Sequence, residues 1–288
     1  MLKRALAMAV VVLASVVLTS ASPAYEIKPR TPDSAFSGKL QPDILGLSSN
    51  IDASKAGSIF ESHARELGVA PQATQQKFGS SNITYVSVMR LDRPAAPDHA
   101  AESLSAAFSS PASGNLAYFI SRDLGFLGGQ QPTKAEMIQR VIDKYGTPTL
   151  IGDGVIYFFY KGGKLVSVKQ KYTPANAADA LNAPIAPRAA VALNDANGHG
   201  SCVAMLKRAQ ALTDRSLDQL NAATTETNCD GLVAVGLSPG TSPDRVGKAV
   251  FTVIDFKLAT SAAKIDSEAL AAQKNDASRN STSNAPKL

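Results

Sequence analysis

The sequence contains no tryptophan, and only 6% of its residues are aromatic. Sugar-binding clefts and base-stacking platforms are commonly built from aromatic side chains, so this composition argues against both. The net charge of +5 falls to +3 if an N-terminal segment carrying Lys3 and Arg4 is removed. The remaining charge does not require a nucleic-acid partner, and we expect none.

Cysteine and histidine are scarce, with two and three copies in the chain. His199 and Cys202 lie at a spacing that one metal ion could use, but zinc normally takes three or four protein ligands. His63 and His99 are far from this pair in the sequence. We therefore expect no metal site and no cofactor.

Long hydrophobic runs are limited to the N-terminus. Lys3 and Arg4 precede an apolar run over residues 5–18, which is shorter than the about 20 residues of a membrane span. This pattern predicts a secretory signal peptide rather than a transmembrane helix, with an uncleaved signal anchor as the alternative.

The small residues Ser22 and Ala24 precede the predicted processing site, so we expect cleavage after Ala24, with cleavage after Ala21 as the close competitor. The mature chain would lie in the periplasm or be secreted, without stable membrane insertion. In such an oxidising compartment two cysteines most often form one disulfide, so we predict a Cys202–Cys229 bond. Two free thiols, or a cysteine and histidine metal site, are the alternatives.

Composition divides the chain into six segments. These are a signal peptide (1–24), an extended proline-containing arm (25–42), an α+β region (43–172), an Ala- and Pro-rich loop (173–200), Cys-containing C-terminal strands (201–260) and a disordered tail (261–288).

The first predicted helix starts near Ser54, with Asp52 or Ser54 as its N-cap and Gly68 just past its end. Three strand-like runs follow, over residues 83–91, 103–109 and 115–122. Turn-forming residues at 111–114 predict that the last two runs form a hairpin.

The second helix has the clearest signals. Thr133 and Glu136 form a capping box, while Gly146 and Pro148 end the helix. Its apolar face, which we expect to be largely buried, consists of Ile138, Val141, Ile142 and Tyr145. A hairpin with strands over 155–160 and 165–171 follows it.

A helix followed by strands therefore occurs twice, at 54–122 and 133–171. We predict an α+β fold in which an antiparallel sheet carries two amphipathic helices on one face. Strands at 232–237 and 249–258 would extend the sheet as a disulfide-tethered C-terminal hairpin. The pattern over 201–212 fits either a strand or a helix.

Two stretches resemble a family of proteobacterial periplasmic proteins of unknown function. They are Asp43-Ile-Leu-Gly-Leu47 before the first helix, and Asp123-Leu-Gly-Phe126 followed by Lys144-Tyr-Gly-Thr-Pro148. The helix, Tyr-Gly-x-Pro and Gly-Gly-Lys hairpin also resemble modules of the SmpA/BamE and β-lactamase-inhibitor-protein type. This resemblance implies a small α+β module that binds proteins and performs no chemistry.

The sequence contains matches to catalytic motifs, but these matches lack features that the chemistry requires. Gly236-Leu-Ser238-Pro-Gly240 matches a nucleophile elbow, but Pro239 lacks the backbone N–H that an oxyanion hole needs. Ser261 and Lys264 form an S-x-x-K match in the low-complexity tail. Lysines and aromatics of the 155–171 hairpin could form a basic surface, although strand alternation would turn many of the aromatics inward.

We therefore predict a non-enzymatic periplasmic protein, without catalytic residues, that binds an envelope protein. The alternative is an envelope hydrolase that uses His63 or His99 with a carboxylate. A histidine and a carboxylate converging within about 3 Å in a deep pocket would favour the hydrolase.

Overall fold

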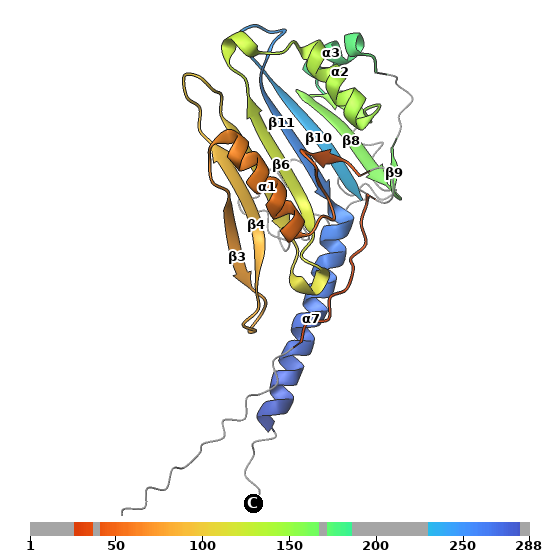
Figure 1. Cartoon of the computed structure of the whole chain (residues 1–288). Helices are drawn as coiled ribbons and strands as arrows, with labels where there is room; N and C mark the ends of the chain where they lie inside the picture. The colour runs from red at the N-terminus through yellow and green to blue at the C-terminus, as the bar shows by residue number, and fades with distance from the viewer. Residues whose placement is uncertain (1–25, 37–40, 167–171, 186–229, 283–288) are drawn as a thin grey trace, which may run out of the picture.

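One large antiparallel sheet is the frame of the molecule (Figure 1). The computed structural model describes residues 26–36, 41–166, 172–185 and 230–282. Within these residues the strand order is β3-β4-β5-β6-β11-β10-β8-β7, with β9 paired to β8. The strands are β3 (Gln72–Lys77), β4 (Thr84–Arg93), β5 (Glu102–Phe108), β6 (Ala117–Gly125), β7 (Leu150–Gly152), β8 (Val155–Lys161), β9 (Lys164–Leu165), β10 (Gly231–Pro239) and β11 (Val246–Asp255).

Within the same residues, the remaining elements are a small hairpin and six helical segments. The hairpin pairs β1 (Asp43–Ile44) with β2 (Leu47–Ser48). The described helices are α1 (Ala53–Leu67), α2 (Lys134–Tyr145), α3 (Pro174–Asn182) and α7 (Phe256–Thr282), with short 3-10 turns η1 (Pro111–Ser113) and η2 (Gly128–Gln130).

Local signals place the ends of α1 and α2 as predicted. The Asp52 side chain accepts a hydrogen bond from the Lys55 backbone N–H, and Gly68 follows α1 with a left-handed φ of 69°. Both hydrogen bonds of the Thr133–Glu136 capping box are present at the start of α2. These predictions are confirmed.

The sheet consists of two halves with the same element order. In the first half α1 precedes the meander β3-β4-β5-β6, and in the second half α2 precedes β7, β8, β10 and β11. The halves meet where β6 pairs with β11. The C-terminal strands therefore lie at the centre of the sheet, because β10 also pairs with β8.

Helices α1 and α2 contribute to the same core cluster. Phe60 of α1 and Ile138 of α2 are fully buried and belong to a cluster with Ile120 of β6 and Phe158 of β8. The hairpin β1–β2 lies between the two helices (Figure 1) and contacts both β6 and β11. Successive side chains of a strand point to opposite faces of the sheet. Every second side chain of the strands therefore faces the helices.

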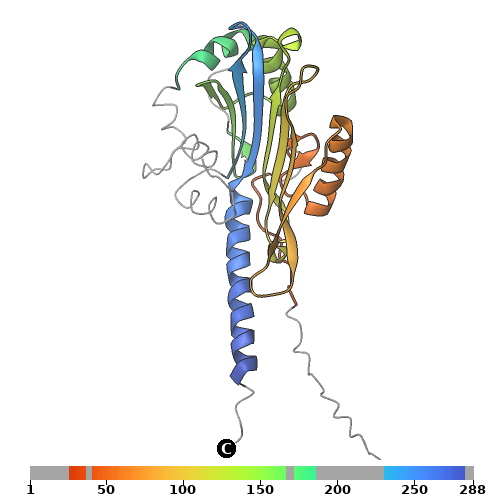
Figure 2. The same cartoon turned by 90° about the vertical axis from the view of Figure 1, so that its left-hand side faces the viewer.

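The opposite face of the sheet packs against the start of α7. Phe256 and Leu258 are buried there with Phe119, Tyr157 and other residues of a second cluster. Figure 2 shows α1 and α7 on opposite sides of the sheet, and α7 extending beyond the end of the strands. No helix among the described residues is long and apolar enough to cross a membrane.

A buried carboxylate joins α7 to the N-terminal arm. Asp255 is fully buried and accepts hydrogen bonds from the hydroxyls of Ser34 and Ser49 and from the backbone N–H groups of Ala35 and Leu258. Burial raises the pKa of Asp255, although these four donors act in the opposite direction. The same residue therefore caps α7 and holds residues 34 and 35 against it.

Two segments that were expected to be a loop and a disordered tail are helical. A helix, α3, begins at Pro174 inside the expected loop 173–200, where Thr173 and Asn176 form a capping box. The expected disordered tail 261–288 is helical through Thr282. Ala-rich sequence without strong periodicity becomes helical here because Leu258, Ala259 and Ala262 pack on the sheet.

The arm 25–42 also differs in part from its prediction. Residues 26–36 lack regular secondary structure, as expected, but Ala35 and Phe36 belong to the core. The ring of Phe36 packs edge-on against Tyr160, with ring centres 4.9 Å apart. The C-terminal strand expected over 249–258 ends at Asp255, where the Asp255 cap starts α7.

Candidate functional site

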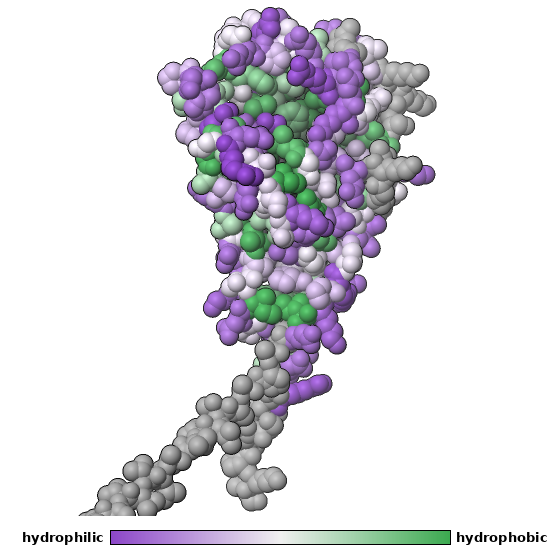
Figure 3. Space-filling model, in the orientation of Figure 1, coloured by the Kyte–Doolittle hydropathy of each residue, from purple (hydrophilic) through white to green (hydrophobic). Residues whose placement is uncertain are grey.

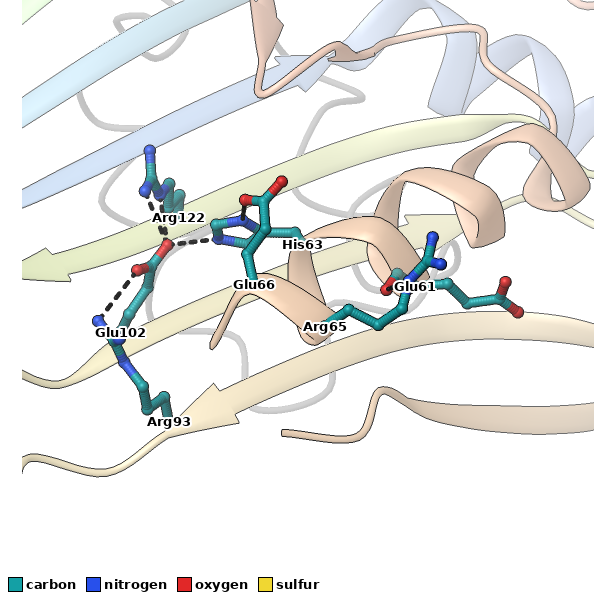
Figure 4. Close-up of polar contacts among 7 residues, drawn as sticks. All are labelled: Glu61, His63, Arg65, Glu66, Arg93, Glu102 and Arg122. Carbon is teal, nitrogen blue, oxygen red and sulfur yellow. Dashed lines mark hydrogen bonds and ion pairs between the residues drawn. The ribbon is translucent and has the colours of Figure 1, made fainter. Parts of the chain in front are cut away.

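A buried ionic cluster joins α1 to the sheet where the end of β4 and the start of β5 lie beside β6 (Figure 4). His63 of α1 lies with Nε2 2.7 Å from Oε1 of Glu102, the first residue of β5. Arg122 of β6 donates to the same carboxylate oxygen from Nε at 2.8 Å. Arg93 of β4 approaches the other oxygen at 3.5 Å. The cluster therefore joins one helix and three strands.

Glu102 carries its charge deep in the fold, with a side chain that is 3% exposed. Burial by itself raises the pKa of Glu102, but the hydrogen bond from His63 and the charge of Arg122 outweigh it, so the pKa lies below its usual value of 4.5. The buried Nε of Arg93 has no hydrogen-bond partner among the described residues. The cluster is thus charged at neutral pH and strongly polar.

The geometry of His63 argues against a role as a general base. Its Nδ1 lies 3.2 Å from Oε2 of Glu66, and its Nε2 faces Glu102. Because both ring nitrogens contact carboxylates, neither is free to take a proton from a substrate. His63 is buried and hydrogen-bonded on both sides, and its position indicates a structural ion network.

The second histidine of the hydrolase alternative lies on an exposed loop. Nδ1 of His99 is 2.8 Å from Oδ1 of its neighbour Asp98, whose side chain is 85% exposed. His63 and His99 belong to separate sites, since their contacts share no residue. The structure therefore places each histidine beside a carboxylate, but the two histidines do not share one site.

The other motifs occupy ordinary structural positions. Ser238 is exposed at the end of β10, and the chain continues to β11 rather than to a helix. Ser261 lies in α7, where its hydroxyl accepts a hydrogen bond from the Asp33 backbone N–H. The aromatic residues Tyr157, Phe159 and Tyr160 are buried, so they form no exposed basic and aromatic surface.

Several predicted features lie outside the described residues. These are the signal peptide with cleavage after Ala24, the cysteine pair Cys202 and Cys229, and His199. They stay predictions. Among the described residues, no group of three or more His, Cys, Asp or Glu side chains could hold a metal ion.

The helix-bearing face carries an unusual leucine. Leu45 is at the tip of the β1–β2 hairpin, and it is the exposed large hydrophobic residue among those described, at 37%. Its φ of 56° is in the left-handed region, which bulky side chains rarely adopt. The next residue, Gly46, has a φ of 83°, so both central residues of this two-residue turn have positive φ.

Specific contacts hold the hairpin in this conformation. The Asp43 side chain accepts a hydrogen bond from the Gly46 backbone N–H at 2.9 Å. Tyr145 of α2 donates to the Asp43 carbonyl, and Lys144 pairs with the Asp43 carboxylate. Leu45 is therefore presented on a rigid support.

Hydrophobic side chains gather around this hairpin. Figure 3 shows them in a hollow of the face between α1 and α2, with hydrophilic residues around it. Ile59 of α1 lies next to Gly46, and Phe251 of β11 is half-buried on the same face. We call Leu45, Ile59 and Phe251 the apolar band.

Sequence reasoning did not find the apolar band. The one usable signal for the apolar band in the sequence is the glycine of Asp43-Ile-Leu-Gly-Leu47. This glycine takes the second position of a two-residue turn. Ile59 and Phe251 are nearly 200 residues apart, and their proximity to the hairpin depends on the pairing of β6 with β11.

Comparisons of the chain with protein-family models, with curated proteins and with solved structures find no match.

Proposed function

We propose that the protein is a non-enzymatic periplasmic protein that binds another protein of the cell envelope through the apolar band. The exposed and conformationally strained Leu45 is the observation that carries this proposal. Export by the N-terminal signal and a Cys202–Cys229 disulfide belong to the same proposal. The resemblance to SmpA/BamE and β-lactamase-inhibitor-protein modules also favours a protein partner.

The energetics of Leu45 support an intermolecular role. A left-handed conformation costs a bulky residue about 1–2 kcal/mol, whereas asparagine or glycine adopts it more readily. An exposed leucine recovers only part of this cost from burial within the chain. A partner that buries Leu45 would offset the rest of this conformational cost. Residues with strained backbones are often found at ligand-binding and active sites.

The surroundings of Leu45 indicate what the partner presents. The hydrophobic centre with a hydrophilic border has the usual anatomy of a protein–protein interface. Asp43 and Lys144 lie at this border and form an ion pair with each other. Together they therefore add little net charge. The partner would therefore offer an apolar pocket for Leu45 with an uncharged polar border.

The substitution Leu45→Asn tests the proposal. Asparagine tolerates the left-handed conformation, so relief of strain should offset the lost apolar contact and change the unfolding free energy by less than about 1 kcal/mol. A photo-crosslinking residue at Ser62, one helical turn from Ile59, should give a discrete adduct in the envelope fraction. Leu45→Asn should abolish that adduct.

A crosslinker at the exposed Thr241, in the loop between β10 and β11, is the matched control and should give no adduct. An adduct from Ser62 that persists in the Leu45→Asn protein would contradict the proposal. So would a large loss of stability, since it would make Leu45 a core residue.

A further inference from the structure

The two outer strands of the sheet differ in how they are covered. Beside β7, at one edge, the Asp153 backbone N–H donates to the Ala183 carbonyl, and a side chain on Gly152 would collide with Ile185. The segment after α3 therefore covers this edge. β3 is the opposite edge, on the left of Figure 1, and Figure 2 looks onto it. All six residues of β3 are exposed.

The backbone of β3 has hydrogen-bonding groups that point away from the sheet. The Phe78 backbone N–H donates to the Ile83 carbonyl next to β4, so Phe78 and every second residue before it face β4. The intervening residues, Ala73, Gln75 and Lys77, therefore direct their N–H and C=O groups outward. Within the described residues, β4 is the strand that pairs with β3, and no backbone hydrogen bond crosses its outer edge.

β3 also lacks the features by which edge strands usually avoid pairing. Prolines, several charges or a bulge in the edge strand commonly serve this purpose. The register shift between β3 and β4 places the extra residue, Ser87, in β4, so β3 itself has no bulge. Pro71 lies just before the strand, and Lys77, its one charged residue, is at its end. The outer edge is therefore open to another strand over residues 73–77.

The sequence of β3 is complementary to a second copy of itself. Two antiparallel copies can pair with Gln75 opposite Gln75 on a two-fold axis, which places Ala73 of each copy opposite Lys77 of the other. All three outward-facing residues then exchange backbone hydrogen bonds. Like charges are not opposed, and Thr74 lies beside Gln76 of the other copy on the second face.

The ends of the strand favour this register over its neighbours. Displacing the two strands toward their C-terminal ends brings the two Lys77 side chains together, which is repulsive. Displacing them the other way brings in Pro71, which has no N–H to donate. The register centred on Gln75 is therefore the one that uses the whole outer edge.

We infer that the protein forms a symmetric dimer in which two β3 strands pair and join the two sheets into one. An unrelated peptide added to a sheet edge is selected through pockets for its side chains, and the two cavities over β4, β5 and β6 include no residue of β3. A second copy needs no such pocket, because the self-complementary strand sets the register.

The helices leave room for this arrangement. α1 packs against β4, one strand inward from the edge. Two copies of α1 would be separated by three strand spacings, or about 14 Å, whereas packed helices need only about 8–10 Å. The dimer does not depend on the apolar band.

Analytical ultracentrifugation of the exported protein over a range of concentrations tests the inference. We expect a reversible dimer with twice the mass of the chain. Gln75→Lys places two like charges at the axis and should raise the dissociation constant at least tenfold, and Gln75→Glu should do the same. An equimolar mixture of these two variants should restore dimer formation. Thr147→Lys adds an exposed lysine just before β7, at the other edge, and should leave the dimer unchanged.

Gln75→Pro removes an outward-facing N–H but none that faces β4, so it should also abolish the dimer. Thermal unfolding of each variant shows that any loss of dimer is not a loss of fold. A dimer that is insensitive to the three Gln75 substitutions, or a mixture that stays monomeric, would overturn the inference. A wild-type chain that is monomeric at millimolar concentration would overturn it as well. The Leu45→Asn protein should dimerise normally, which separates this test from that of the apolar band.

Discussion

Glu102 illustrates, at the scale of one residue, how a charge becomes part of a protein core. The carboxylate receives hydrogen bonds from His63 and Arg122, and Arg93 lies on its other side. Removing one member of such a buried cluster leaves the opposite charges uncompensated, which costs more than the loss of a surface ion pair. The network therefore matters for stability more than for catalysis.

We predict that Glu102→Gln lowers the unfolding free energy by about 2–3 kcal/mol, because Arg122 and His63 would lose the charge that compensates their burial. Chemical denaturation of the two proteins at neutral pH measures the loss. Glu66→Gln is the matched control, since the Glu66 side chain is 68% exposed and should contribute less than about 1 kcal/mol. Equal effects of the two substitutions would contradict the prediction.

The same carboxylate should make stability depend on pH. The pKa of Glu102 is lower in the folded protein than its usual value of 4.5, so its contribution is complete above that value. The contribution is lost as the pH falls through the lower, folded pKa. The stability difference between wild type and Glu102→Gln should therefore shrink below pH 4.5, and a constant difference in thermal melts down to pH 3 would count against this.

At the scale of elements, α2 shows how local signals and packing combine. The capping box and Gly146 define its ends, and Met137, Ile138, Val141 and Tyr145 are buried. Ile142 is only partly buried against the core. The predicted apolar face was thus confirmed in three of its four residues, because the face is slightly rotated from the one that the periodicity indicates.

This rotation leads to a prediction for a pair of substitutions. Ile138→Asp places an unpaired charge at a fully buried position and should lower the unfolding free energy by more than about 4 kcal/mol. Ile142→Asp introduces the same charge at a partly exposed position and should cost about half as much. Urea denaturation followed by circular dichroism compares the two, and a larger effect at Ile142 would mean that the helix is oriented differently.

At the scale of the whole molecule, the two halves depend on each other. The strands β6 and β11 pair at the centre, and one core cluster includes residues from α1, α2 and strands of both halves. Because neither half contains a complete sheet core, we expect the protein to unfold as one cooperative unit.

The predicted Cys202–Cys229 disulfide also belongs to this scale, because Cys229 immediately precedes the Asp230 residue that leads into β10. Closing a loop of about 28 residues should stabilise the fold by roughly 3–4 kcal/mol. A thiol assay on the exported, unfolded and unreduced protein should find no free sulfhydryl. Two free thiols per chain would refute the disulfide, and a metal ion that is lost on Cys202→Ser would revive the metal-site alternative.

Local chemistry accounts for the existence and the ends of most elements. Asp52, Thr133 and Gly68 act on backbone groups within four residues, so caps and turns can be identified from the chain alone. The strand-forming runs at 155–160, 232–237 and 249–258 likewise predicted β8, β10 and much of β11. The capping box of α3 was visible in the sequence as well, but Asn at its third position is a weaker signal than Glu.

Long-range pairing was decided only by the folded molecule. The position of β10 and β11 at the centre of the sheet, the contact of β1 with β11, and the meeting of His63 with Glu102 all join residues that are distant in the chain. Periodicity states that a residue faces a core, but not which element covers it, because many partners satisfy the same hydrophobic pattern. Tertiary packing selects one of them, and with it the surfaces that remain free for binding.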